Sequence, residues 1–456
     1  MLKTVGEPHH STAFSSWCLF VLGLFSATKV YFVGCVAISE LIVFFVAPIV
    51  YWRVRRQMRY EGFLQFIRML LAVMAAMFVS SLVNGTAWPF VVKDFANIYS
   101  VLAYYVVFYS LLRNDMKRGL GWFFLGAAFS GVITIFALNP QAQVLDTGFA
   151  YVGNVDSEDI IKGPLFWIQK IKDFGQLPIF AAYLKTPLAY SLLTPILFSI
   201  FALMTTVSGR SATLSILLGG ALMCIGRKSR RTMLIAGQHF FLFLFLGCSI
   251  IFLYKGIYAY TAKAGILGED AIRKYEYQTK GKGGMLQLLM SGRKEFFISI
   301  PAILEKPLLG HGPHALDSRG YAQRFFQKYA DPDEFTTYLY YLRKQLSAGF
   351  LPEIPSHSHI MGAWLHYGII GLLFYVWFLY TIFKHIKHYA AAIPQWYGYF
   401  SVTIASYAWH IFFSPFGARP LFAMFAVCLF FARAVGMKKI TLPYEMEKEA
   451  CEYDCR

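Results

Sequence analysis

The sequence is built from long apolar runs that recur from Ser15 to Gly436. A run of roughly 17 to 25 apolar residues is the length that an α-helix needs to cross the hydrocarbon layer of a bilayer. The chain has 456 residues, of which 57% are hydrophobic and only 15% charged. That balance excludes an ordinary soluble multidomain protein. We therefore predict an all-α, polytopic membrane protein.

The basic residues lie in short clusters between these runs and contribute to a formal net charge of +17 at pH 7. A nucleic-acid-binding protein gathers such charge on one soluble face, whereas these clusters are spread along the chain between apolar runs. Because Lys and Arg accumulate in the cytoplasmic loops of membrane proteins, we predict that five clusters face the cytoplasm. They are Arg53, Arg55, Arg56 and Arg59; Arg113, Lys117 and Arg118; Arg227, Lys228, Arg230 and Arg231; Lys384 and Lys387; and Lys438 and Lys439.

The clusters divide the chain into membrane and outer-side regions. Spans are predicted near 15–34, 35–52, 63–83, 94–112, 119–138, 232–254, 359–383, 396–414 and 419–437. The number of crossings between residues 175 and 227 stays open, which gives about 10–12 transmembrane helices. The predicted regions are N-terminal transmembrane helices over 1–254 with an outer-side segment near 139–175, a large helical outer-side insertion over 255–357, C-terminal transmembrane helices over 358–437, and a cytoplasmic tail over 438–456.

Two identical Ser-Gly-Arg triplets stand out, at residues 208–210 beside an apolar run and at residues 291–293 in the insertion. Glycine lets a backbone approach a ligand closely, and a guanidinium group binds phosphate oxygens in a bidentate way. Arg210 and Arg293 are therefore candidate phosphate ligands, with Ser291 a weaker candidate. Taken alone, Arg210 is also explained as a charge reaching from a helix end to the interface, and Arg293 as a solvated loop charge.

The residues after Arg293 predict a short amphipathic helix. Apolar side chains recur there at helical spacing: Phe296, Phe297, Ile300, Ile303 and Leu304. Pro307 ends the pattern, and the N-terminus of such a helix favours anions through its free N–H groups and its dipole. A glycine turn follows at residues 310–312. Its His311 is a weaker site candidate, because His311 and His314 are explained more simply as turn or packing residues.

A polar stretch from Pro355 leads into an apolar run and places histidines at the mouth of a predicted membrane helix. His357 lies eleven residues before Gly368. This is about three helical turns, so both are expected on one face of one helix, roughly 16 Å apart. Neutral histidine accepts a proton near neutral pH, which suits His357 to activating a hydroxyl group. The alternative is an interfacial histidine bonded to water or backbone. His359 is a weaker candidate, and His366 is expected inside the span, bonded to another helix.

Other chemistries find little support in the sequence. It contains no P-loop, no H-E-x-x-H, no G-x-S-x-G and no dinucleotide fingerprint. The nearest approach to a carboxylate cluster is Asp331, Asp333 and Glu334, which a loop turn explains. We therefore expect a mechanism without a metal ion or other cofactor.

The order of these features resembles the O-antigen ligases and their superfamily of bacterial polysaccharide polymerases. The shared features are an S-G-R entering a span, a second S-G-R followed by an aromatic helix, P-x-x-G-x-G, and a histidine eleven residues before G-I-I-G. They cover residues 206–372, whereas the first five predicted spans match only in being apolar. The family usually has Asn after the histidine, where this chain has Ser358.

The resemblance implies an inner-membrane glycosyltransferase whose site faces the periplasm, which makes the outer-side regions periplasmic. Such enzymes use undecaprenyl-pyrophosphate-linked glycans as donors, and the ligase moves O-antigen onto lipid A-core oligosaccharide, completing lipopolysaccharide without a metal ion. Arg210 and Arg293 match the family's essential arginines, and His357 its essential histidine. The arginines would hold the pyrophosphate, and His357 would deprotonate the acceptor hydroxyl, which attacks the anomeric carbon with inversion.

Two other interpretations stay open. An O-antigen polymerase or a protein O-oligosaccharyltransferase would use the same donor with another acceptor, and the sequence separates them poorly from a ligase. A transporter of lipid-linked sugars is disfavoured, because transporters tend to keep charges midway along their spans. Only Lys29, Glu40 and Arg68 are charges of that kind here.

Overall fold

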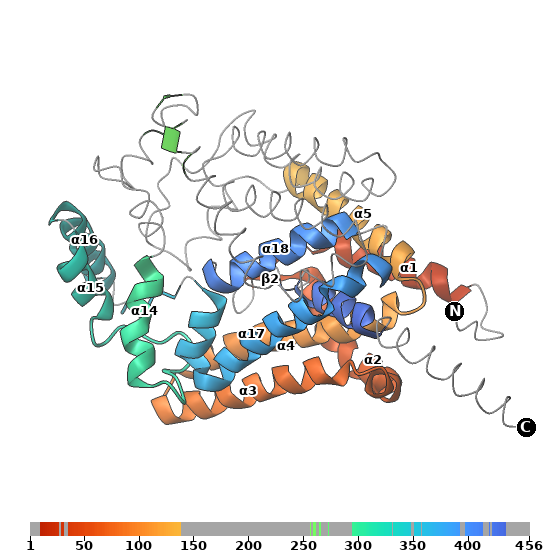
Figure 1. The fold of residues 1–456 in the computed structure, drawn as a ribbon, viewed down its shortest axis with the longest axis horizontal. Coiled ribbons are helices and arrows are strands. Elements are labelled where there is room, and N and C mark those ends of the chain that lie inside the picture. Colours follow the sequence, from red (N-terminus) through yellow and green to blue (C-terminus); the bar gives the residue numbers. More distant parts are fainter. Residues whose placement is uncertain are drawn as a thin grey trace, which may run out of the picture.

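The structure is a computed structural model. It describes residues 10–26, 29–31, 35–137, 294–330, 332–347, 351–356, 358–392, 397–413 and 422–434, together with Arg419 and a few isolated positions between 256 and 272. The described residues are mostly helical, and the one sheet among them is a two-stranded hairpin (Figure 1). With its long apolar helices, the chain has the all-α membrane fold that the sequence predicts.

Five helices form the N-terminal part: α1 (His10–Leu24), α2 (Ile38–Tyr60), α3 (Leu64–Asn84), α4 (Trp88–Leu112) and α5 (Met116–Ala137). Helices α1 and α5 cross closely at two glycines. A Cβ atom on Gly23 would stand 2.1 Å from the carbonyl oxygen of Phe123, and one on Gly126 would stand 2.0 Å from that of Phe20. Small residues at such crossings let membrane helices pack backbone to backbone.

The connection between α1 and α2 differs from the sequence prediction of spans near 15–34 and 35–52. Helix α1 ends at Leu24, and an antiparallel hairpin of β1 (Lys29–Tyr31) and β2 (Cys35–Ala37) precedes α2. The run after Ser26 is rich in β-branched and aromatic residues, which favour strands. Counting apolar residues does not separate such a run from a helix, which is why this prediction was wrong.

The insertion contributes α14 (Lys294–Glu305), α15 (Tyr321–Tyr329) and α16 (Pro332–Ser347), and α17 (His359–Ala392), α18 (Tyr397–Phe413) and a last helix over Phe422–Ala434 follow. The helix predicted after Arg293 is α14, but the expected face is only partly the buried one. Ile298 and Ala302 are buried, whereas Phe297 and Leu304 are exposed. The side that α14 buries is therefore turned partly away from the predicted one, and it leaves these two apolar side chains outside the core.

Three described helices are long and apolar enough to cross a membrane: Leu64–Asn84, Trp88–Leu112 and His359–His385. The basic ends of α2 and α4 lie together, because the guanidinium of Arg113 donates to the side chain of Gln57. The position of these two ends side by side agrees with the prediction that their basic clusters face the same side of the membrane. The spans predicted between 139 and 254 lie largely outside the described residues, so the total of about 10–12 stays a prediction.

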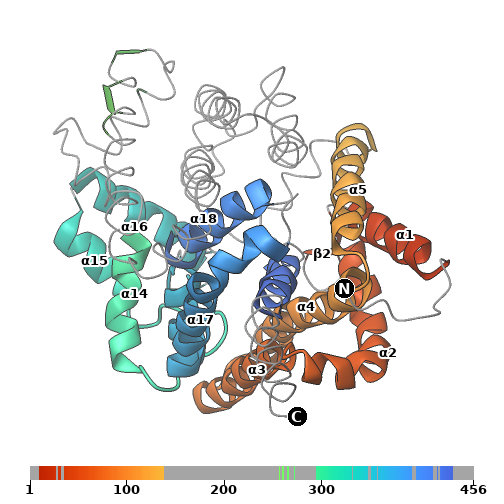
Figure 2. The same cartoon turned by 45° about the vertical axis from the view of Figure 1, so that its right-hand side comes forward.

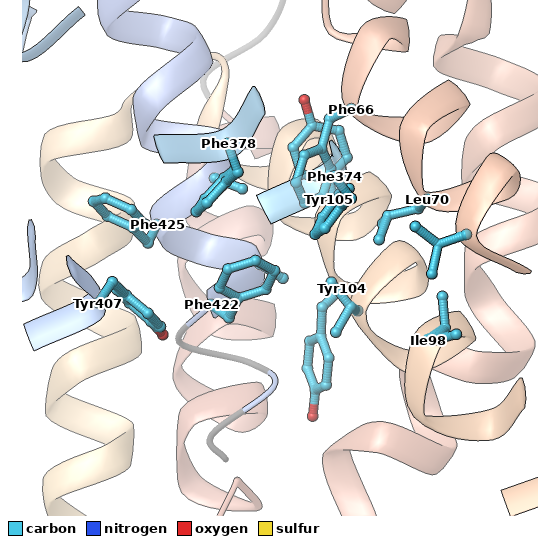
Figure 3. Packing of buried hydrophobic residues seen from close by; sticks show 14 of the residues in the cluster. Phe66, Leu70, Ile98, Tyr104, Tyr105, Phe374, Phe378, Tyr407, Phe422 and Phe425 are labelled. Atoms are coloured by element: carbon cyan, nitrogen blue, oxygen red, sulfur yellow. The ribbon is translucent and has the colours of Figure 1, made fainter. Parts of the chain in front are cut away.

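The core lies where α3, α4, α17 and the last helix meet, and aromatic rings fill it (Figure 3). Phe66 of α3 and Tyr105 of α4 have ring centroids 4.5 Å apart, and Phe378 of α17 lies 5.0 Å from Phe422. Ring pairs at these separations add to the stabilisation from buried apolar area. This core holds α17 against α3 and so sets the position of the candidate site.

Candidate functional site

Helix α17 consists of two helices joined by a break at Gly368, which has φ 66° and ψ −154°. Its first part, residues 359–367, lies beside α14 and runs in the same direction, and its second part turns away (Figures 1 and 2). The expectation of one continuous helix through Gly368 is therefore wrong, whereas position 357 lies outside the described residues. Glycine at 368 adopts a backbone conformation that is essentially closed to other residues, and this interrupts the helix.

The turn after α14 is joined to this break by main-chain hydrogen bonds. The N–H of His311 donates to the carbonyl of Leu365 at 2.7 Å, and the N–H of Ile369 donates to the carbonyl of Leu308 at 3.1 Å. In an unbroken helix Ile369 would bond to Leu365 itself. The turn thus satisfies both groups that the break separates, as buried backbone requires.

The same turn contacts the end of α3. Asn84 donates from Nδ2 to the carbonyl of Gly310 at 3.1 Å and accepts a bond from Lys306 Nζ at 2.5 Å. The Ser80 hydroxyl donates to the carbonyl of His366 at 2.9 Å, so the predicted helix contact of His366 exists but uses its main chain. Because α3 ends here, the break lies at the end of the bundle opposite the basic ends of α2 and α4.

His311 packs into this turn. Its Nε2 donates to the carbonyl of Ala302 at 2.7 Å, which fixes the tautomer. Burial lowers the pKa of His311, the bond to Ala302 acts in the opposite sense, and the nearby Lys306 ammonium lowers the pKa further. A neutral, hydrogen-bonded ring fits the interpretation of His311 as a turn residue.

Four predicted site residues lie outside the described residues, and their roles stay predictions: Arg210, Ser291, Arg293 and His357. Two of them directly precede described structure. Helix α14 begins at Lys294, and the first part of α17 begins two residues after position 357. Since the two helices run in the same direction, their N-termini lie at the same end of the pair (Figure 1). The positive ends of two helix dipoles at one end of the pair favour a bound anion there.

Ser358 caps the first part of α17. Its hydroxyl accepts from the N–H of Met361 at 3.3 Å and donates to the carbonyl of Ile411 in α18 at 3.0 Å. Ser and Asn both cap helices in this way, which explains how Ser can stand where the family named above usually has Asn. The neighbouring His359 is buried, with Nδ1 3.4 Å from the Tyr375 hydroxyl, which places this weaker candidate inside the packed core.

A polar cluster that the sequence pattern did not reveal surrounds His314. Its Nδ1 lies 2.7 Å from Glu353 Oε1, and its Nε2 lies 3.5 Å from Asp94 Oδ1. Tyr367 donates to the other Asp94 oxygen at 2.7 Å. Burial disfavours the charged ring, but the hydrogen bonds that its N–H groups donate to Asp94 and Glu353 outweigh burial and raise the pKa of His314 to about 9. The ring is therefore a cation between two carboxylates at neutral pH.

In comparison with known families, residues 194–376 match the model of the O-antigen ligase family. This match confirms the resemblance seen in the sequence and supports assignment to that family. It covers Arg210, Arg293 and His357, as well as α14 and the break in α17. Its coarse implication is a ligase or polymerase of the glycosyltransferase type, acting on lipid-linked polysaccharide at a membrane. No relative among curated proteins matches the chain.

Proposed function

We propose that this protein is an inner-membrane glycosyltransferase that moves O-antigen polysaccharide from undecaprenyl pyrophosphate to a sugar hydroxyl of lipid A-core, in lipopolysaccharide biosynthesis. The observation that carries the proposal is the family match over residues 194–376, which includes all three residues that the sequence singled out for chemistry. The site faces the periplasm in this proposal, because the break in α17 lies opposite the basic ends of α2 and α4.

Arg210 and Arg293 hold the pyrophosphate and stabilise the charge that grows on it as the bond between sugar and phosphate breaks. Helix α14 begins directly after Arg293, so the N–H groups of its first turn add to anion binding. A diphosphate whose charge is matched in this way is a good leaving group. No covalent intermediate on the protein and no metal ion is required in this mechanism.

His357 takes the proton from the acceptor hydroxyl, which attacks the anomeric carbon from the face opposite the diphosphate. Inversion at that carbon follows. The next residue, Ser358, is fixed by its cap on α17 and its bond to Ile411, which supports a defined position for the base.

The test is glycan transfer by purified full-length protein supplied with undecaprenyl-diphosphate-linked O-antigen and lipid A-core, with EDTA present. Wild type should extend lipid A-core, and folded His357→Ala, Arg210→Lys and Arg293→Lys variants should not. Lengthening of the lipid-linked glycan instead would make the protein a polymerase, and transfer to a protein serine would make it an oligosaccharyltransferase. Wild-type transfer that occurs without EDTA and is lost when EDTA is added would refute the metal-free mechanism.

A further inference from the structure

We propose that His314 is a positioning residue, which holds the chain segment leading into position 357 through an ionic clasp with Glu353 and Asp94. The clasp is defined as Asp94, His314, Glu353 and Tyr367. The proposal rests on the proposed function, in which His357 is the base.

The segment 351–356 is neither helix nor regular strand, so its position depends on the bonds it makes. The N–H of Ile354 donates to the carbonyl of Ala315 at 2.8 Å, and the N–H of Asp317 donates to the carbonyl of Pro352 at 2.7 Å. These two bonds flank Glu353, whose side chain then pairs with His314. Glu353 is four residues before position 357, so at most about 14 Å of chain separates them.

His314 itself is held in an unusual conformation. Its φ is 50°, and among the described residues no other non-glycine residue has positive φ. Such a backbone persists only where the surroundings enforce it, and it often marks a functional position. The Phe90 ring lies 5.0 Å from the His314 ring, and the side chains of His314 and Asp94 are only 15% and 10% exposed. The ion pair between them is therefore poorly screened by solvent.

The clasp joins helix α4 to the segment that precedes position 357 in the sequence and to the helix that follows it. Asp94 belongs to α4, Glu353 lies upstream of the position, and Tyr367 ends the first part of α17 downstream of it. Because Tyr367 and His314 bind opposite oxygens of Asp94, one carboxylate links the upstream segment to the helix that follows. Both ring nitrogens of His314 face carboxylates, so the ring serves as a cation. In the described part of the chain no three His, Cys, Asp or Glu side chains form a metal site.

A general base must lie within hydrogen-bonding reach of the hydroxyl that it deprotonates, and a displacement of about 1 Å can lower the rate about 100-fold. Release of the segment is therefore expected to lower turnover. Affinity for the donor should change little, since neither arginine proposed to bind the pyrophosphate belongs to the clasp.

The experiment compares full-length wild type with His314→Gln, Glu353→Gln and the double variant in the glycan-transfer assay. Each single variant should lower kcat by about 10- to 100-fold with donor KM nearly unchanged. The double variant should be no worse than the poorer single one, because both break one clasp. Arg319→Gln is the matched control: Arg319 pairs with Glu305 at 2.7 Å in the same insertion, but its side chain is 63% exposed and not part of the clasp.

The pH profile gives a readout that a purely structural role would not move. Wild-type kcat should fall as pH rises through about 9, where His314 loses its proton, and this decline should be absent in His314→Gln. The titratable groups around the ring are Asp94 from α4, Glu353 from the upstream segment, and Tyr367 and His366 from α17, with Lys93 acting on Glu353.

The outcomes separate the two proposals. Transfer by wild type together with unaltered kcat in folded Gln variants would overturn the clasp and leave the proposed function intact. A rise in donor KM alone would overturn the positioning role as well. Absence of transfer by wild type would refute the proposed function, and the clasp's role in it would fall too. Glu353→Gln changes a half-exposed side chain without changing its shape, so this variant should fold.

Discussion

Gly368 packs against Leu308 so closely that a Cβ atom at position 368 would stand 2.0 Å from the Leu308 carbonyl oxygen. The contact joins the turn after α14 to the point where α17 changes direction. Two separate requirements therefore meet at one glycine, a positive φ and space for a neighbouring main chain.

Gly368→Ala should lower the free energy of unfolding by about 2–4 kcal/mol, because it combines backbone strain with a main-chain clash. Thermal unfolding of the detergent-purified protein measures this. Gly62→Ala is the control: Gly62 has φ 79°, but nothing lies within 4 Å of the place that a Cβ atom would take, so only strain of about 1 kcal/mol applies. Equal losses in the two variants would show that the close approach to Leu308 is unimportant.

Ser358→Ala should lower the free energy of unfolding by about 0.5–2 kcal/mol, because the first N–H groups of α17 lose their cap. Ser358→Asn should retain most of the stability and of the glycan transfer, since an Asn side chain can accept from the N–H of Met361 in the same way. Thermal unfolding and the transfer assay, run on both variants, test this. An Asn variant as impaired as the Ala variant would contradict capping as the role of this side chain.

Stability should depend on alkaline pH through His314. Folding raises its pKa from 6.5 to about 9, so the folded protein binds this proton more tightly than the unfolded chain. The contribution is fully present below pH 6.5, declines above it, and is lost as pH rises through about 9. Unfolding temperatures measured from pH 6.5 to 9.5 should therefore fall more steeply for wild type than for His314→Gln. Parallel curves would mean that His314 is not a buried cation.

Removal of only one partner of the ion pair between Glu40 and Arg419 should strongly destabilise the protein. Arg419 Nε lies 2.9 Å from Glu40 Oε1, and the Glu40 side chain is only 4% exposed. Arg419→Gln leaves a buried carboxylate without its cation and should cost about 3–5 kcal/mol. The exposed pair of Arg319 and Glu305 provides the control, for which Arg319→Gln should cost about 0–1 kcal/mol. If thermal unfolding gives similar losses, burial of Glu40 is not decisive.

The length of an apolar run alone predicted the position of some helices closely. The spans predicted at 63–83 and 396–414 are the helices Leu64–Asn84 and Tyr397–Phe413. The span predicted at 94–112 begins earlier, at Trp88, because Pro89 suits the first turn of a helix and the charges of Lys93 and Asp94 had hidden that turn from a hydropathy count. The hydropathy count also failed to detect the hairpin before α2.

The break in α17 and the His314 clasp could not be predicted, because both depend on partners far away in the chain. Gly368 was expected inside a continuous helix, and only its contacts with Leu308 and the turn beside it show where the chain changes direction. His314 was interpreted from the sequence as a turn or packing residue, and only the fold shows that Asp94 of α4 lies beside its ring. For Arg210, Arg293 and His357, sequence and family match supply the whole argument, since these positions lie outside the described residues.

The turn after α14 is joined to α17 by peptide groups, and peptide groups are the one component that substitution leaves in place. The side chains of Leu308 and Ile369 can therefore be replaced without loss of these bonds, while the glycines at 310 and 368 cannot. We expect relatives that handle quite different sugars to inherit this junction unchanged. Differences in substrate choice would then arise from the side chains around the junction, whereas the backbone of the junction would be shared by these relatives.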